Sequence, residues 1–369
     1  MGIMTKKQLR YGFTTGACAA AAAKGAALML RDQQIMDEVE ITLPAGITTH
    51  FHLHGQKIVN DTATCYVIKD GGDDPDVTNG AEIHVSIRVD YFATRSILLE
   101  GGTGIGRVTK PGLAVPVGGW AINPVPRIMI LEVVKEVFAM RCLPKTLTVS
   151  VTIPNGEELA KKTLNARLGI VGGLSILGTS GIVNPISAAA WTDTIDSAID
   201  VALACGSATM TLSTGRTSEL AAQKYLASGE SGTESARDLK EEAFVLMGDH
   251  VGHALRACEA KGVKEVILAG QFAKLVKIGC GHEQTHASSS ELDLRMIQEW
   301  LAASPVAPHL AALVHGANTA RHLLESSGND PILIGLVTDR VREYAATIAP
   351  KIKIKVLLAG YGGEVLYFG

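Results

Sequence analysis

The second half of the chain repeats a short apolar run, a glycine or serine loop and a segment of helical length, beginning at about residue 161. Such runs are typical of parallel strands buried on both faces, because the crossover helices cover each side of the sheet. We therefore predict an α/β three-layer domain with a mainly parallel sheet over residues 161–369. Its predicted strands are Thr209–Leu212, Ala243–Met247, Glu265–Ala269, Ile332–Val337 and Ile352–Leu358.

The first half mixes helices and strands without that regular alternation, and we predict an α+β domain over residues 1–160. Thr14 or Thr15 is expected to cap a helix through Ala17–Leu30. A second helix is expected to begin at Asn123 and to run through Met140. The predicted strands are Val39–Leu43, a hairpin of His50–His54 and Thr62–Lys69 around Gly55-Gln56, Glu82–Val89 and Thr146–Ile153.

Composition narrows the class of protein. A chain of 369 residues is long enough for two domains with separate cores. The net charge of −3 gives no global basic field, which argues against a nucleic-acid partner. No apolar run reaches the ~18 residues of a membrane span. The cysteines form no C-x-x-C pair, which favours the reducing cytoplasm; they are Cys18, Cys65, Cys142, Cys205, Cys258 and Cys280.

Residues 282–286, His-Glu-Gln-Thr-His, match the H-E-x-x-H motif, in which two histidines bind zinc and the glutamate activates a water. The motif requires one helix that carries both histidines on the same face. Gly279 and Gly281 precede it, and Ser288–Ser290 follow as candidate caps for a helix over Leu292–Leu301. The sequence thus predicts a loop here and disfavours a zinc hydrolase.

Two short stretches in the first half suggest ligand sites but also have plainer explanations. Thr14 and Thr15 open a helix with free N–H groups and hydroxyls, which suits an anion, and an ordinary capped helix fits equally well. Cys18 lies in the first turn, where a thiolate is stabilised, although a buried small residue is the commoner reason for it. Gly101–Gly106 lacks the glycine spacing and the following helix of a dinucleotide site.

Other clusters are weighed in the same way. Gly178–Gly181 is a group of small hydrogen-bond donors that could bind the carboxylate or the ribose of a cofactor. The alternative is a strand and a tight turn at a domain junction. Lys274 and Lys277 share one face of a predicted helix. Two interpretations are open: both contact a ligand, or both are ordinary solvated side chains. Neither His50–His54 nor the acidic turn over Asp70–Asp76 has the spacing of a structural metal site.

Several long stretches together resemble the cobalt-precorrin-5B C1-methyltransferases, the CbiD family of anaerobic cobalamin biosynthesis. They span most of the chain in order, which makes the resemblance far more specific than any short motif. The stretches are Tyr11–Ala26, Val67–Ile83, Gly104–Ile130, Asn165–Ser187 and Gly270–Ser290.

The resemblance implies transfer of a methyl group from S-adenosylmethionine to C1 of cobalt-precorrin-5B, giving cobalt-precorrin-6A. We expect no protein-bound metal, no membrane and no nucleic-acid partner, and a homo-oligomer is possible. A non-catalytic tetrapyrrole carrier is the rival interpretation. His286 or a carboxylate is expected to act as base. The glycine loops of the second domain are expected to bind the methyl donor. The expected residues are His286 and Thr285 (catalytic); Thr14, Thr15, Cys18, Lys110, Arg127, Lys274 and Lys277 (substrate); and Gly172, Gly173, Gly178, Thr179, Ser180 and Gly181 (cofactor).

Overall fold

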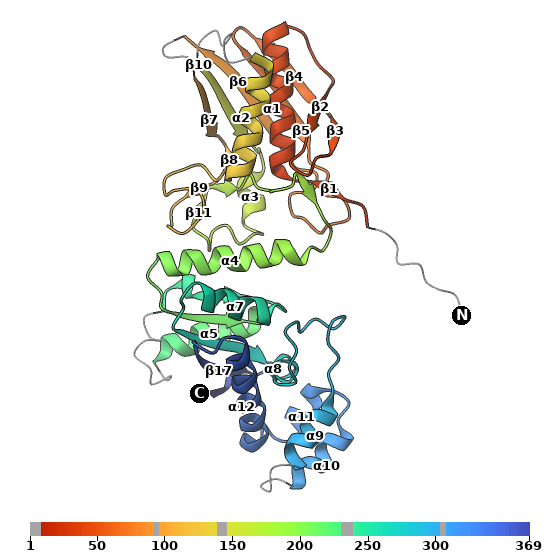
Figure 1. The fold of residues 1–369 in the computed structure, drawn as a ribbon, viewed down its shortest axis with the longest axis vertical. Helices are drawn as coiled ribbons and strands as arrows, with labels where there is room; N and C mark the ends of the chain where they lie inside the picture. The colour runs from red at the N-terminus through yellow and green to blue at the C-terminus, as the bar shows by residue number, and fades with distance from the viewer. Residues whose placement is uncertain (1–8, 92–95, 139–145, 230–238, 303–307) are drawn as a thin grey trace, which may run out of the picture. The chain divides into compact units, whose positions relative to one another are not determined.

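The computed structural model describes residues 9–91, 96–138, 146–229, 239–302 and 308–369 (Figure 1). The chain divides into two compact units, Met1–Ser187 and Ala188–Gly369, which we call unit 1 and unit 2. Each unit is described by itself. None of the helices in the described ranges combines the length and the apolar character that crossing a membrane requires.

Unit 1 is built on a five-stranded sheet of order β4-β5-β6-β10-β7, antiparallel except between β10 and β7. Helices α1 and α2 pack on one face of this sheet, and their apolar residues join its core (Figure 1). The elements are β4 (His54–Val59), β5 (Thr62–Ile68), β6 (Glu82–Asp90), β7 (Ile97–Gly101), β10 (Thr146–Thr152), α1 (Thr15–Asp32) and α2 (Pro124–Phe138).

Local sequence explains these elements. Alternate residues of β5, namely Ala63, Cys65 and Val67, are buried, as expected of a strand with one face on the core. The alanine-rich face of α1 has no bulk, so the helix approaches the sheet closely, and Ala17–Ala23 are buried. The Thr14 side chain accepts a hydrogen bond from the Ala17 N–H, which confirms the predicted cap.

Short strands bind the segment after residue 160 to unit 1. Strands β11 (Ile170–Val171) and β12 (Gly173–Leu174) pair with β9 (Arg107–Val108) and β8 (Gly104–Ile105). The division of the chain therefore falls after Ser187 instead of after residue 160. The predicted boundary at residue 160 rested on the pattern of apolar runs, and that pattern does not reveal which backbone segments pair. Further elements are β1 (Gly12–Phe13), which pairs with β13 (Ile182–Val183), and β2 (Glu38–Thr42), β3 (Thr48–His52) and α3 (Gly156–Ala160).

Unit 2 contains the predicted, mainly parallel sheet, in the order β15-β14-β16-β17-β18 with only β18 antiparallel. Helix α5 packs on one face, while α4, α7, α8 and α12 contribute to the core on the other. The bounds are β14 (Thr209–Ser213), β15 (Phe244–Leu246), β16 (Glu265–Gln271), β17 (Lys353–Ala359), β18 (Val365–Phe368), α4 (Ala188–Ala204), α5 (Arg216–Ser228), α7 (Val251–Ala260), α8 (Phe272–Gly279) and α12 (Pro331–Ile348).

One predicted strand of unit 2 is wrong. Ile332–Val337 lies inside α12, because the Asp330 side chain accepts from the Ile332 N–H and Pro331 starts the helix. An apolar run that is buried on one side only cannot be told from a strand by its length. The remaining elements are η2 (Glu241–Ala243), α9 (Leu294–Ala302), α10 (Pro308–Gly316) and α11 (Ala320–Ser326).

Two local predictions also need correction. The hairpin around Gly55-Gln56 is wrong, because β3 pairs with β2 and β4 pairs with β5 through a turn at Asn60, whose φ is 52°. Asparagine tolerates this left-handed conformation. The cap of α9 is Asp293, which accepts from the Arg295 N–H at 2.9 Å, instead of one of the serines. Helix α2 is described as far as Phe138, and Met140 lies outside the described residues.

Candidate functional site

The carboxyl edge of the unit 2 sheet has a topological switch point between β14 and β16. The loop after β14 leads into α5 on one face, and the loop after β16 leads into α8 on the other. Backbone pairing with β16 continues into the first residue of the loop after β14, since the Thr214 N–H donates to the Ala269 carbonyl at 3.0 Å. Open α/β sheets bind ligands at such a point. The side chains around it are therefore the first candidates for a site.

Asp249, in the loop after β15, is the centre of a polar network. Its carboxylate forms an ion pair with Lys274 and accepts a hydrogen bond from the Thr285 hydroxyl at 2.6 Å. Its carbonyl accepts from the Thr285 N–H at 3.0 Å. Thr285 is completely buried. These bonds join the strand-end loop to residues 280–290, which carry two of the predicted site residues.

The two lysines of α8 reach the same carbonyl. Lys274 Nζ and Lys277 Nζ each donate to the Thr285 carbonyl at 3.1 Å, and Lys277 Nζ also donates to the Ser290 carbonyl at 2.8 Å. The prediction that both ammonium groups lie on one face of a helix is thus confirmed. The fold has gathered Lys274, Lys277 and Thr285 around Asp249.

The charges of this network perturb one another. Burial raises the pKa of Asp249, but hydrogen bonds from Lys274 and Thr285 outweigh it, so this pKa lies below its ordinary value. The pKa of Lys277 is lowered, first by burial and then by the charge of Lys274. Burial also lowers the pKa of His250. Perturbed groups that meet in one place are a physical mark of functional sites.

His286 lies at the exposed rim of the network. Its Nδ1 accepts from the Ser288 N–H at 3.2 Å and lies 2.8 Å from the Ser288 hydroxyl. Because Nδ1 acts as an acceptor, the neutral ring carries its proton on Nε2. This geometry leaves the Nε2–H of His286 as a donor towards a ligand, and its role as base stays a prediction.

The H-E-x-x-H residues do not lie on a helix, which confirms the predicted loop. Helix α8 ends at Gly279, ahead of the motif. Glu283 is instead paired with Arg256 at 3.0 and 2.5 Å, and its carbonyl accepts from the Gly252 N–H. Within the described ranges no three His, Cys, Asp or Glu side chains converge as metal ligands would. Residues 282–286 therefore match the sequence of the H-E-x-x-H motif but lack the helix that the motif requires.

In unit 1, the N–H and hydroxyl groups at the start of α1, the expected anion site, form hydrogen bonds with other groups of the protein. Thr14 caps the helix, and the Gly16 N–H donates to the Leu177 carbonyl at 3.0 Å. Thr15 Oγ1 accepts from the Leu177 N–H at 2.9 Å and lies 3.3 Å from the Ser175 carbonyl. Cys18 is fully buried, and burial raises the pKa of its thiol to about 12. The substrate roles of Thr14, Thr15 and Cys18 stay predictions, without an open donor to support them.

Substitution of Thr15 by valine separates the two readings. We expect the free energy of unfolding to fall by about 1–3 kcal/mol, because the partly buried Leu177 N–H loses its acceptor. The KM for the substrate should not change. Denaturant titration and steady-state kinetics check this, with Thr42→Val as control because it removes an exposed hydroxyl pair with Thr48. A higher KM at unchanged stability would place Thr15 in the substrate site.

The other predicted residues of unit 1 lie in its short strands and turns. Gly172 precedes β12, Gly173 lies in it, and Gly178 packs against the Thr14 side chain, so these glycines belong to unit 1 and not to the domain with the parallel sheet. Ser180 Oγ accepts from the Ile182 N–H at 3.2 Å. The cofactor role of this group stays a prediction, and its remaining members are Thr179 and Gly181.

Two cations of unit 1 complete the list of predicted residues. Lys110 Nζ donates to the Arg167 carbonyl at 3.3 Å, and its aliphatic part fills the space beside Gly169. Arg127 is half-buried in the first turn of α2. Their substrate roles stay predictions.

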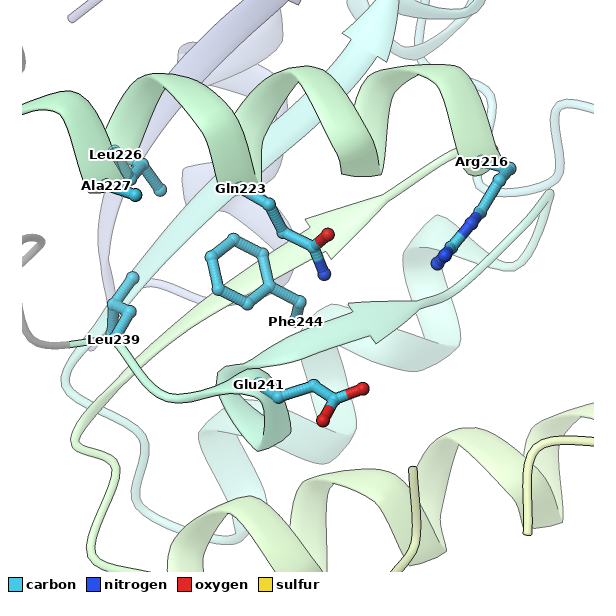
Figure 2. A pocket seen from close by; sticks show the side chains of 7 residues that line it. All are labelled: Arg216, Gln223, Leu226, Ala227, Leu239, Glu241 and Phe244. Atoms are coloured by element: carbon cyan, nitrogen blue, oxygen red, sulfur yellow. The ribbon is translucent and has the colours of Figure 1, made fainter. Parts of the chain in front are cut away.

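A pocket of about 310 Å³ lies along α5 beside the edge strand β15 (Figure 2). The side chains of Arg216 and Gln223 extend from α5 towards β15, and Glu241 lies just before that strand (Figure 2). This volume is at the lower end of those of small-molecule sites, and the mixture of a few polar groups with apolar walls is typical of them. The apolar lining consists of Leu226, Ala227, Leu239 and Phe244.

Comparison with known proteins decides the family. A family model described as CbiD matches residues 3–185, and one described as CbiD, C-terminal domain, matches residues 284–368. A relative from Geobacter sulfurreducens, named cobalt-precorrin-5B C(1)-methyltransferase, is 65% identical over 99% of this chain and 100% of its own length. The chain belongs to the CbiD family. The CbiD match ends close to the last residue of unit 1, Ser187.

Two further known proteins are similar to this chain. A protein of the same name from Geobacter sp. (strain M21) is 64% identical, with 99% of each chain covered. A crystal structure titled cobalamin biosynthesis protein (cbiD), from Archaeoglobus fulgidus, is 26% identical, covers 72% of this chain and 78% of that chain, and has a TM-score of 0.38.

Sequence reasoning missed several residues of this CbiD chain that the fold brings to its candidate sites. Asp249 follows the predicted strand Ala243–Met247, and a carboxylate at the carboxyl end of a parallel strand is a signal that could have found it. Arg216 and Gln223 share one face of α5, but no motif distinguishes them. Glu241 precedes β15 and carried no signal at all.

Proposed function

We propose that this chain transfers a methyl group from S-adenosylmethionine to C1 of cobalt-precorrin-5B and so gives cobalt-precorrin-6A in anaerobic cobalamin biosynthesis. One observation carries the proposal. Relatives named cobalt-precorrin-5B C(1)-methyltransferase are 64–65% identical over nearly the whole of both chains. The substrate is a cobalt-bearing tetrapyrrole with several carboxylate side chains, and such groups need a few well-placed cations and N–H donors.

The network around Asp249 supports binding of the acceptor. Lys277 offers an ammonium group, and His286 offers the Nε2–H of its neutral ring. The Lys274–Asp249 ion pair and the buried Thr285 fix these groups relative to one another. Methyl transfer gains most from alignment of the reacting atoms, which is worth up to ~7–11 kcal/mol of the barrier. A rigid carboxylate-binding network is suited to holding the ring in place.

The α5 face supports binding of the methyl donor. S-adenosylmethionine supplies an electrophilic methyl group on its sulfonium when it is bound. The Gln223 carboxamide fits the edge of an adenine, and the Glu241 carboxylate fits ribose hydroxyls or an ammonium group. Beneath the same helix, the hydroxyls of Thr211 and Ser213 are buried without a partner among the described residues. These residues fit the donor better than the glycine loops of unit 1 do.

Substitution of Gln223 by leucine tests the donor pocket. We expect the affinity for S-adenosylhomocysteine to fall about tenfold, the weight of one hydrogen bond to a buried ligand. Stability should not fall, because within the described residues the Gln223 side chain has no protein partner to lose. Calorimetry measures the affinity, with Lys224→Leu on the exposed side of α5 as control. Equal affinities for wild type and Gln223→Leu would remove the adenosyl group from this pocket.

The reaction itself is tested by incubating the protein with S-adenosylmethionine and cobalt-precorrin-5B. The expected result is a tetrapyrrole heavier by one methyl group, together with one S-adenosylhomocysteine for each product. Mass spectrometry and chromatography follow the two products. A protein that binds the tetrapyrrole tightly but gives neither product would be a carrier, and the proposal would be wrong.

A further inference from the structure

The two lysines of the Asp249 network are not equivalent. Lys274 has a carboxylate partner in Asp249, so its charge is neutralised inside the protein. Lys277 donates to two carbonyl oxygens, those of Thr285 and Ser290, and forms no ion pair within the described part of the chain. Carbonyl groups orient an ammonium group but do not neutralise it. The network of two lysines and one carboxylate thus carries a surplus positive charge on Lys277.

The surroundings of Lys277 make this surplus costly. The side chain is half-buried and lies close enough to Lys274 for the two cations to repel each other. A partly buried cation without a counter-ion is less favourable than one in water, and groups perturbed in this way cluster at functional sites. An ammonium group has three N–H bonds, and the two protein carbonyls account for two of them. One donor is left for a ligand.

We propose that Lys277 is the receptor for a carboxylate of the ligand, and that Lys274, Asp249 and Thr285 are the scaffold that positions it. The proposal rests on the proposed function for the identity of that ligand, which we assign to an acetate or propionate side chain of the tetrapyrrole. Lys277 extends from α8, on the face of the sheet opposite α5. The carboxylate of the methyl donor has the same chemistry, and the experiment distinguishes the two sources.

The test compares Lys277→Gln, which removes the charge, with Lys277→Arg, which keeps it. We expect Lys277→Gln to raise the KM for cobalt-precorrin-5B about 10- to 100-fold, the range for a hydrogen bond to a charged group. Lys277→Arg should recover most of the loss, and the affinity for S-adenosylhomocysteine should stay the same. The control is Lys264→Gln, an exposed lysine next to the amino end of β16.

Calorimetry identifies the source of the carboxylate. Lys277→Gln could weaken the binding of S-adenosylhomocysteine but not that of its decarboxylated analogue. The carboxylate that binds Lys277 would then be that of the methyl donor, and the tetrapyrrole assignment would be overturned. If Lys277→Gln and Lys264→Gln behave alike with every ligand, the receptor role of Lys277 is overturned as well.

Chemical labelling of the wild-type protein gives a readout that depends neither on a variant nor on turnover. Acetylation of Lys277, followed by mass spectrometry, should be slowed by cobalt-precorrin-5B and unaffected by S-adenosylhomocysteine, with Lys264 as internal reference. Equal labelling rates with and without both ligands would contradict the proposal. Failure of the proposed function looks different, because protection of Lys277 would then persist without formation of methylated product.

Discussion

Replacement of Asp249 by alanine is expected to reduce kcat/KM for methyl transfer by about 100-fold, the cost of displacing a reacting group by about 1 Å. The change removes the counter-ion of Lys274 and the acceptor of the buried Thr285 hydroxyl. Both lysines would then share the Thr285 carbonyl without a carboxylate beside them. We also expect the free energy of unfolding to fall by about 1–3 kcal/mol, less than for a fully buried pair because the ion pair is partly exposed.

The control for Asp249→Ala is Asp200→Ala, which removes a partly exposed ion pair with Lys261 elsewhere in unit 2. It should cost at most about 1 kcal/mol and leave activity unchanged. Denaturant titration and steady-state kinetics compare the two variants. Similar losses of activity would mean that Asp249 has no special place in the site.

The pH dependence of stability gives a second check on Asp249. Because its pKa is lower in the folded protein, its carboxylate stabilises the fold above the unfolded pKa of about 3.9. This contribution is lost as the pH falls below that value towards the folded pKa. Asp249→Asn, which has no charge to lose, should lack this acid-dependent part while it keeps the shape of the side chain. An unchanged acid limb in Asp249→Asn would contradict the assignment.

Replacement of Gly104 by alanine is expected to destabilise unit 1 by about 2–5 kcal/mol, the sum of left-handed strain and overpacking. Gly104 has a φ of +74°, and an added Cβ would lie 1.9 Å from the Ile153 carbonyl oxygen and 3.0 Å from Gly156. The neighbouring backbone is equally close, since a Cβ on Gly173 would lie 2.3 Å from Gly104. Thermal or denaturant unfolding measures the loss.

Gly118→Ala is the matched control for Gly104→Ala. Gly118 has a φ of +83°, but nothing lies within 4 Å of an added Cβ, so only the strain of about 1–2 kcal/mol applies. Comparable losses in the two variants would show that backbone contact at Gly104 is unimportant. A larger loss of stability at Gly104 would mean that close backbone packing between β8 and β12 requires glycine in the stretch Gly101–Gly106.

Local features of the sequence determined much of the fold. The apolar run at β16 predicted a parallel strand because a strand covered on both faces needs no polar alternation. Thr14 predicted the start of α1 because a hydroxyl there satisfies a free N–H group. The glycines and serines around residues 282–286 predicted a loop against the metal-binding motif. Each of these signals acts within one or two helical turns of the residue that carries it.

Tertiary structure alone decided the rest. The division after Ser187 depends on pairing between short strands far apart in the chain. Sequence alone predicts the same substrate-binding role for Lys274 and Lys277. In the described residues only Lys274, of the two, forms an ion pair with a carboxylate. Asp249 lies 25 residues before Lys274, and the loops of a parallel sheet bring the two together. Sequence thus determined what each segment forms, whereas charge pairing and close backbone packing depend on distances that only the folded chain defines.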